Sequence, residues 1–200
     1  LQAVAGDETF DFQAAVFRLA GAPAPAPRPE QGAAALGEQQ LFMSHAALSE
    51  LSAQRYQQIE RVNREGWQAR AARGQLDLWA SPIRAQAQAE GLAFELEYQL
   101  PNDTQVQLTL TPRKPMVSFG ERGLSRKGAD PAAVSLYWSY TRLQVAGRII
   151  HKGVATEVEG VAWQDHEIAS SQLGAELAGW DSLPSSNACN ARCVSDGCPR

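Results

Sequence analysis

The chain has 200 residues, of which 44% are apolar and 20% are charged, and its formal net charge is −4. This length suffices for one sizeable core, or for one domain and part of another. The charge argues against nucleic acid as a partner, because phosphate binding needs a clustered basic face. No apolar run approaches the ~20 residues that span a bilayer, so we expect no transmembrane segment.

Alternation of apolar and polar residues recurs along the chain as far as residue 158 and is typical of half-exposed β-strands. Short alternating runs joined by tight turns predict an antiparallel barrel or sandwich, and no βαβ rhythm is present. The alternating runs, in chain order, are Phe10 to Val16, Leu41 to Ala47, Leu76 to Leu78, Ile83 to Ala89, Leu92 to Leu100, Val106 to Leu110, Val134 to Tyr140 and Val154 to Val158.

The clearest hairpin is predicted around the turn Pro101-Asn102-Asp103, which separates two of these runs. One segment, Ala47 to Glu65, has loosely spaced apolar residues that allow a helix. Ala20 to Gly37 is rich in Ala, Pro and Gly and predicts a long loop.

The end of the chain has a different composition. Residues 185–200 are small and polar, without periodicity, and contain all three cysteines (Cys189, Cys193 and Cys198). Their spacing fits neither a paired zinc site nor a redox Cys-x-x-Cys, so we interpret this segment as a disordered tail. No signal peptide is visible and the chain opens at Leu1 without Met, which indicates a fragment or a processed chain.

The stretch Trp163-Gln164-Asp165-His166-Glu167 concentrates residues that carry chemistry. One hypothesis is acid–base work, in which a protonated carboxyl group donates, a histidine takes a proton from water and an indole stabilises a cation. The other hypothesis, which the spacing favours, is a structural network in which the two acids accept hydrogen bonds from the backbone and His166 is a hydrogen-bonded core residue. In a strand, Asp165 and Glu167 would point one way and His166 the other.

Three other features have a functional and a structural interpretation. Gly179-Trp180-Asp181 reads as a turn with a packed indole. His45 would share a strand face with Leu41 and Met43 and look into the interior, either as a core residue or lining a ligand cavity. The loop Gly120 to Gly128 lacks Walker and dinucleotide spacing, so we expect its basic residues to be solvated. No spacing of the three histidines predicts a metal site.

The chain contains, in this order, the motifs Phe10 to Arg18, Met43 to Leu48, Gly120 to Gly128, Ser135 to Ser139 with Thr141 to Leu143, Val158 to Glu167 and Gly179 to Asp181. As an ordered set they resemble the carotenoid 1,2-hydratase/AttH family of lipocalin-like proteins. The chain departs from the family pattern at Ile168 and Ser182, where an aromatic residue is usual. The family's Glu-Trp-Trp-Tyr strand is missing before Leu1, and the resemblance stops after Leu183.

The resemblance implies an all-β fold with two consecutive lipocalin-like domains. We therefore expect a lipocalin-like antiparallel domain over residues 1–157, the start of a second one over 158–184 and the tail beyond it, in a truncated or divergent member. The family includes hydratases that add water to a terminal isoprenoid double bond without a cofactor. It also includes AttH-like envelope proteins associated with an ABC transport system.

From this resemblance we expect an AttH-like periplasmic or secreted protein that binds an apolar, isoprenoid or lipid-like small molecule. The alternative is a cofactor-independent carotenoid 1,2-hydratase, with His166 as the base. The expected catalytic residues are His166, Asp165, Glu167 and Asp181, and the expected ligand-binding residues are His45, Trp138, Tyr137, Trp163 and Trp180.

Overall fold

The computed structural model describes residues 2–19, 40–128, 130–131 and 133–169. Within these residues the secondary structure consists of β-strands, and none forms a helix long and apolar enough to cross a membrane. The strands are β1 (Gln2–Ala5), β2 (Glu8–Leu19), β3 (Leu41–Glu50), β4 (Arg55–Arg64), β5 (Ala69–Ala71), β6 (Asp77–Ala80), β7 (Ile83–Ala87), β8 (Phe94–Leu100), β9 (Thr104–Pro112), β10 (Val117–Ser118), β11 (Leu124–Arg126), β12 (Val134–His151) and β13 (Val154–Ala169).

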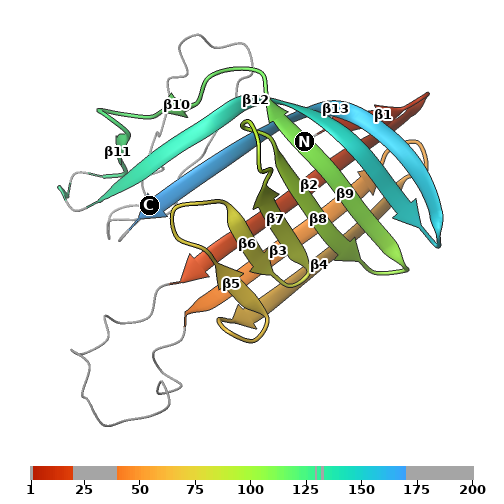
Figure 1. Ribbon diagram of the computed structural model, residues 1–200, viewed down its shortest axis with the longest axis horizontal. Helices are drawn as coiled ribbons and strands as arrows, with labels where there is room; N and C mark the ends of the chain where they lie inside the picture. The colour runs from red at the N-terminus through yellow and green to blue at the C-terminus, as the bar shows by residue number, and fades with distance from the viewer. Residues whose placement is uncertain (1, 20–39, 129, 132, 170–200) are drawn as a thin grey trace. The chain divides into compact units, whose positions relative to one another are not determined.

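The strands form one ladder in the order β4-β3-β2-β1-β13-β12-β9-β8-β7-β6-β5, with β10 and β11 paired to β12 (Figure 1). The expected hairpin at residues 101–103 is confirmed: β8 and β9 pair antiparallel, with Phe94 opposite Leu110. Of the antiparallel barrel or sandwich that alternation predicted, the all-β antiparallel fold is confirmed, and it takes the form of a barrel.

The helix allowed for residues 47–65 is wrong, because this segment forms the end of β3, a turn and β4. The turn places Gln54 at a positive φ of 49°. Gln57 and Asn63, two of the buried residues of β4, are polar. Because amides occupy buried positions of β4, its sequence does not show the alternation of apolar and polar residues that identifies a strand.

The described residues divide into two compact units. Unit 1 contains the described residues of 1–111 and 144–161, and unit 2 contains those of 112–143 and 162–169. Strands β12 and β13 each contribute residues to both units. Since β13 runs without a break past residue 157, the division does not follow the single boundary expected there. That residues 158–184 open a second lipocalin-like domain stays a prediction.

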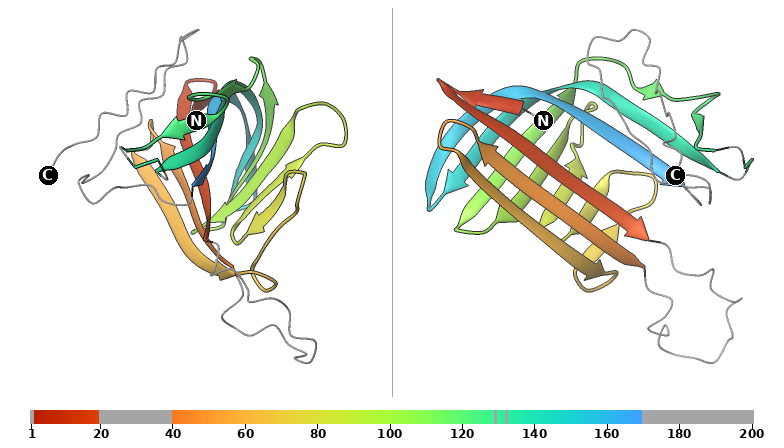
Figure 2. Two further views of the ribbon diagram at one scale, coloured as in Figure 1. Left: turned by 90° about the vertical axis from the view of Figure 1, so that its left-hand side faces the viewer. Right: turned by 180° about the vertical axis from the view of Figure 1, so that it is seen from behind.

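Unit 1 is a nearly closed barrel, in which the wall of β2, β3 and β4 faces the wall of β6 to β9 (Figure 2). Its interior is filled by apolar side chains, among them Phe42, Leu48, Tyr98, Val106 and Val158, all with at most 1% of their surface exposed. Burial of this apolar surface is the main driving force for closing the sheet.

Hydrogen bonds across the barrel interior join the two walls of unit 1. Ser44 donates through Oγ to the carbonyl oxygen of Ser81 at 2.6 Å, and Asn63 donates through Nδ2 to the same oxygen at 2.9 Å. The Tyr98 hydroxyl donates to the carbonyl of Ala47 at 3.1 Å, and burial strongly raises the pKa of that hydroxyl, so Tyr98 stays a neutral donor. These bonds fix the β6–β7 turn against β3 and β4.

A second buried network joins β4 to the turns at one end of unit 1. Gln57 donates through Nε2 to Thr104 Oγ1 at 3.2 Å, and Thr104 Oγ1 lies 2.9 Å from His151 Nδ1. These contacts bring the β8–β9 and β12–β13 turns together with β4, so polar as well as apolar contacts close the barrel.

Candidate functional site in unit 2

The sequence stretch around Asp165 lies on β13 in unit 2, where its carboxylate is a hydrogen-bond centre. Oδ1 of Asp165 accepts from the Tyr137 hydroxyl at 3.0 Å, from Trp163 Nε1 at 2.7 Å and from the Ser139 hydroxyl. Tyr137 and Ser139 are two residues apart on β12, as Trp163 and Asp165 are on β13, so each pair shares a strand face. Three protein donors therefore share one oxygen of this carboxyl group.

Glu167, on the same strand face, forms an ion pair with Lys127. The Lys127 Nζ lies 2.9 Å from Glu167 Oε1, and only 7% of the lysine side chain is exposed. The same ammonium lies 4.9 Å from the centre of the Tyr137 ring, and that ring stacks on Phe119 at 4.5 Å. Cation–π and ring contacts of this kind stabilise a partly desolvated ammonium. Both acids of the stretch are therefore engaged by protein groups.

His166 points away from the two acids and stacks on Trp138. The ring centres are 4.3 Å apart and the rings are inclined by 15°. Partial burial disfavours the charged imidazolium and lowers the pKa of His166 below 6.5. Its imidazole is consequently neutral at neutral pH and able to accept a proton.

Apolar side chains surround this stacked pair on the same sheet face. Leu136 lies two residues before Trp138 on β12, and Leu124 of β11 lies directly opposite Leu136. Ile168 lies two residues after His166 on β13. These three side chains are 44%, 48% and 54% exposed, respectively. We call Leu124, Leu136, Trp138, His166 and Ile168 the aromatic–aliphatic face.

The structure separates the expected site residues as alternation predicts. Asp165 and Glu167 lie on one face with Tyr137 and Trp163, and His166 lies on the other with Trp138. A catalytic role for any of them stays a prediction. Trp180 and Asp181 lie outside the described residues. Within the described residues, no group of three His, Cys, Asp or Glu side chains converges to hold a metal ion.

The expected orientation of His45 is wrong. The residues of β3 buried inside unit 1 include Phe42, Ser44 and Leu48, whereas His45 packs edge-on against the half-exposed ring of Phe17 at 5.5 Å. The Leu41–Met43–His45 set is the outer face of the strand, because Phe42 and Ser44 fill the interior. The run Phe-Met-Ser-His alone allows either face to be inside.

The sequence did not predict the contacts of two residues of the site, Lys127 and Ser139. Lys127 was expected to be solvated, but it is buried against Glu167 and Tyr137. Ser139 was noticed only as part of a motif, yet its hydroxyl donates to Asp165. The available signal was its i, i+2 spacing from Tyr137, which places both on one strand face.

A family model described as AttH-like matches residues 1–184. The chain belongs to the AttH-like family. It is similar to the crystal structure of a protein described as AttH from Nitrosomonas europaea, with 28% identity, a TM-score of 0.71, and coverage of 90% of this chain and 52% of that one. It thus spans about half the length of that AttH-like structure.

Kievitone hydratase from Nectria haematococca shares the fold, with a TM-score of 0.59 and 12% identity over 85% of this chain and 47% of that one. No curated protein gives a significant match to this chain.

Proposed function

We propose that this AttH-like chain is a binding protein, and that its aromatic–aliphatic face holds an apolar, isoprenoid or lipid-like small molecule. We further propose a place in the cell envelope, periplasmic or secreted, in association with an ABC transport system, as the family resemblance implies. The observation that carries the proposal is the engagement of both acids of the Asp-His-Glu stretch in contacts with the protein.

Acid–base addition of water to an alkene needs a carboxylic acid that can release a proton. Asp165 Oδ1 already accepts from three donors, and Glu167 is paired with Lys127 at 2.9 Å. Both carboxyl groups are thus held in contacts with protein groups. These acids therefore support the structure of unit 2 better than they support proton donation.

The opposite sheet face offers what an apolar ligand needs. The stacked Trp138 and His166 rings provide a flat surface, flanked by Leu124, Leu136 and Ile168. Exposed apolar patches of this kind mark binding sites more often than isolated exposed residues do. With its pKa lowered, His166 adds no charge to this face at neutral pH, so an apolar molecule can cover it without burying an ion.

The second candidate is the carotenoid 1,2-hydratase activity, and His166 is the observation that favours it. A neutral imidazole stacked on Trp138 could take a proton from water next to a cation that the indole stabilises. The acid for this reaction would have to be a group other than Asp165 or Glu167.

One experiment separates the two candidates. The chain is incubated with an acyclic carotenoid, binding is followed by tryptophan fluorescence, and the extract is analysed by mass spectrometry for a hydrated product. We expect saturable binding and an unchanged carotenoid mass. A mass increase corresponding to one water that requires His166, tested with His166→Phe, would establish the hydratase instead. Absence of both binding and product would refute both candidates.

A further inference from the structure

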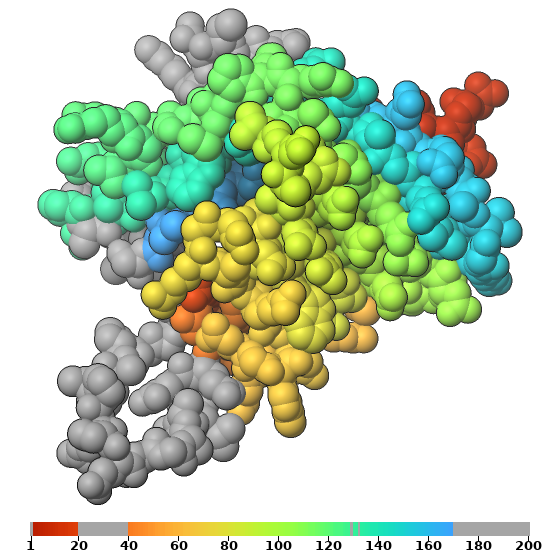
Figure 3. Space-filling model, in the orientation of Figure 1, coloured from red at the N-terminus to blue at the C-terminus, as the bar shows by residue number. Residues whose placement is uncertain are grey.

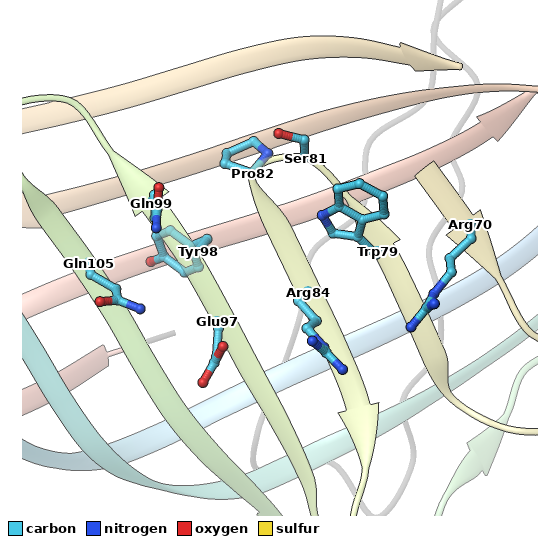
Figure 4. A pocket seen from close by; sticks show the side chains of 9 residues that line it. All are labelled: Arg70, Trp79, Ser81, Pro82, Arg84, Glu97, Tyr98, Gln99 and Gln105. Carbon is cyan, nitrogen blue, oxygen red and sulfur yellow. The ribbon is translucent and has the colours of Figure 1, made fainter. Parts of the chain in front are cut away.

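Unit 1 carries a pocket on the outer surface of strands β5 to β9, away from its apolar interior. Its volume is about 420 Å³, within the range of ~300–1,000 Å³ usual for small-ligand sites. Figure 3 shows the outer surface of these strands, and Figure 4 shows the side chains that line the pocket. The lining side chains that face outward from the strands are Arg70, Trp79, Arg84, Glu97, Gln99 and Gln105.

Strand register explains why these side chains meet. Trp79 of β6 lies opposite Arg70 on one neighbouring strand and opposite Arg84 on the other, and Arg84 in turn lies opposite Glu97. Directly opposite residues share a sheet face with Cβ atoms roughly 5 Å apart. Arg84 stands between the buried Ile83 and Ala85, so this row faces outward.

A second row completes the pocket. Gln99 lies opposite Gln105 across β8 and β9. Glu97, Gln99 and Gln105 each directly precede a buried residue of their strand. Because neighbouring side chains of a strand point to opposite faces, the two amides face outward with Glu97. The pocket therefore combines carboxamides, a carboxylate and guanidinium groups around one indole.

The rim of the pocket is held rigidly. Ser81 and Pro82, in the β6–β7 turn, also line it. The Ser81 carbonyl accepts hydrogen bonds from Ser44 and Asn63, both almost fully buried in the barrel wall. A rim tied to the core keeps its geometry without a ligand, which reduces the entropy lost on binding.

The chemistry of the lining selects among ligand classes. The Trp79 ring, 37% exposed, offers an apolar platform, while planar amide, guanidinium and carboxylate groups surround it with both donors and acceptors. An apolar ligand would leave these groups unpaired, and a strongly anionic ligand would meet the Glu97 carboxylate. A molecule with an apolar ring face and many hydroxyl groups satisfies the whole set.

We propose that this outer-wall pocket binds carbohydrate, with one sugar ring stacked on Trp79 and its hydroxyl groups bonded to Arg84, Glu97 and the two glutamines. The Arg84 guanidinium is already oriented by a 3.1 Å hydrogen bond to Gln86 Oε1, and Arg70 by a 3.7 Å ion pair with Asp77. Each guanidinium has five N–H donors, so donors remain for a ligand. This site is separate from the aromatic–aliphatic face and does not depend on its function.

The test is calorimetric titration of the intact chain with three hexasaccharides: β-1,4-linked glucose, α-1,4-linked glucose and β-1,4-linked N-acetylglucosamine. We expect saturable binding of at least one of them. Trp79→Ala should weaken that binding about tenfold, which corresponds to ~1.4 kcal/mol and lies within the range for an aromatic contact. Trp67→Ala is the matched control, because Trp67 is 79% exposed and does not line the pocket, and it should bind as the parent does.

Glu97→Gln keeps the size of the side chain and serves as a second variant should Trp79→Ala unfold. It should weaken sugar binding severalfold by removing a charged acceptor. The proposal is overturned if none of the three sugars binds at about 10 mM, a concentration that detects even millimolar affinity. It is also overturned if Trp79→Ala, or Glu97→Gln should Trp79→Ala unfold, binds the sugar as tightly as Trp67→Ala does.

Discussion

Removal of the Asp165 carboxylate should lower the free energy of unfolding of unit 2, by an amount set by the donors that it leaves behind. Asp165→Ala leaves three donors without their acceptor, and two of them belong to buried residues, Ser139 at 0% and Tyr137 at 7% exposure. A buried donor without a partner costs about 1–3 kcal/mol. We expect a loss of about 2 kcal/mol, counted for the fully buried Ser139 hydroxyl and a weakened Tyr137 contact, because Asp165 itself is open to water that can replace it in part.

The free energy of unfolding is measured by urea titration with circular dichroism and tryptophan fluorescence. Asp165→Asn retains an acceptor oxygen and should lose only about 1 kcal/mol, the difference between charged and neutral hydrogen bonds. Glu159→Ala, an exposed acid on the same strand, is the control and should change stability by less than about 0.5 kcal/mol. If Asp165→Ala behaves like this control, the carboxylate is not a structural centre and the reasoning is refuted.

Three further predictions concern other parts of the fold. Because the pKa of His166 is lowered in the folded chain, the unfolded chain binds more protons below pH 6.5. The melting temperature should therefore fall as the pH drops from 7 to 5. The variant His166→Phe should show a smaller fall. Asn63→Leu removes donors to Ser44 and to the Ser81 carbonyl and should cost about 1–3 kcal/mol in urea titrations, whereas an unchanged midpoint would deny this network a role. Gly120 has a φ of 70°, and a Cβ there would collide with the Leu124 carbonyl, so Gly120→Ala should lose more than about 1 kcal/mol; equal stability would show that the turn relaxes freely.

Alternation predicted most of the barrel because apolar side chains fill the interior of unit 1. The β8–β9 hairpin is the clearest case, since Tyr98, Val106 and Leu108 all point inward from a strong turn signal. Strand β4 escaped prediction because Gln57 and Asn63 occupy buried positions of that strand. The Nε2 group of Gln57 and the Nδ2 group of Asn63 donate to partners distant in sequence, Thr104 and Ser81, and no local pattern reveals such partners.

The candidate site was predictable in outline. Strand geometry separated His166 from Asp165 and Glu167, as the structure confirms. The burial of Lys127 could not be foreseen, because a lysine in a glycine-rich loop is normally solvated. Its contacts with Tyr137 and Glu167 come from strands that follow later in the sequence. The outward orientation of His45 was missed because both faces of β3 carry apolar residues.

The most direct test of the binding function is the affinity of one acyclic isoprenoid, squalene in detergent micelles, for two matched tryptophan variants. Trp138→Ala removes the platform under His166, whereas Trp67→Ala removes an exposed indole in unit 1. We predict that Trp138→Ala weakens binding about tenfold, in line with ~1.4 kcal/mol for an aromatic contact, and that Trp67→Ala binds as the parent chain does. Equal affinities in the two variants would contradict a ligand site on the aromatic–aliphatic face.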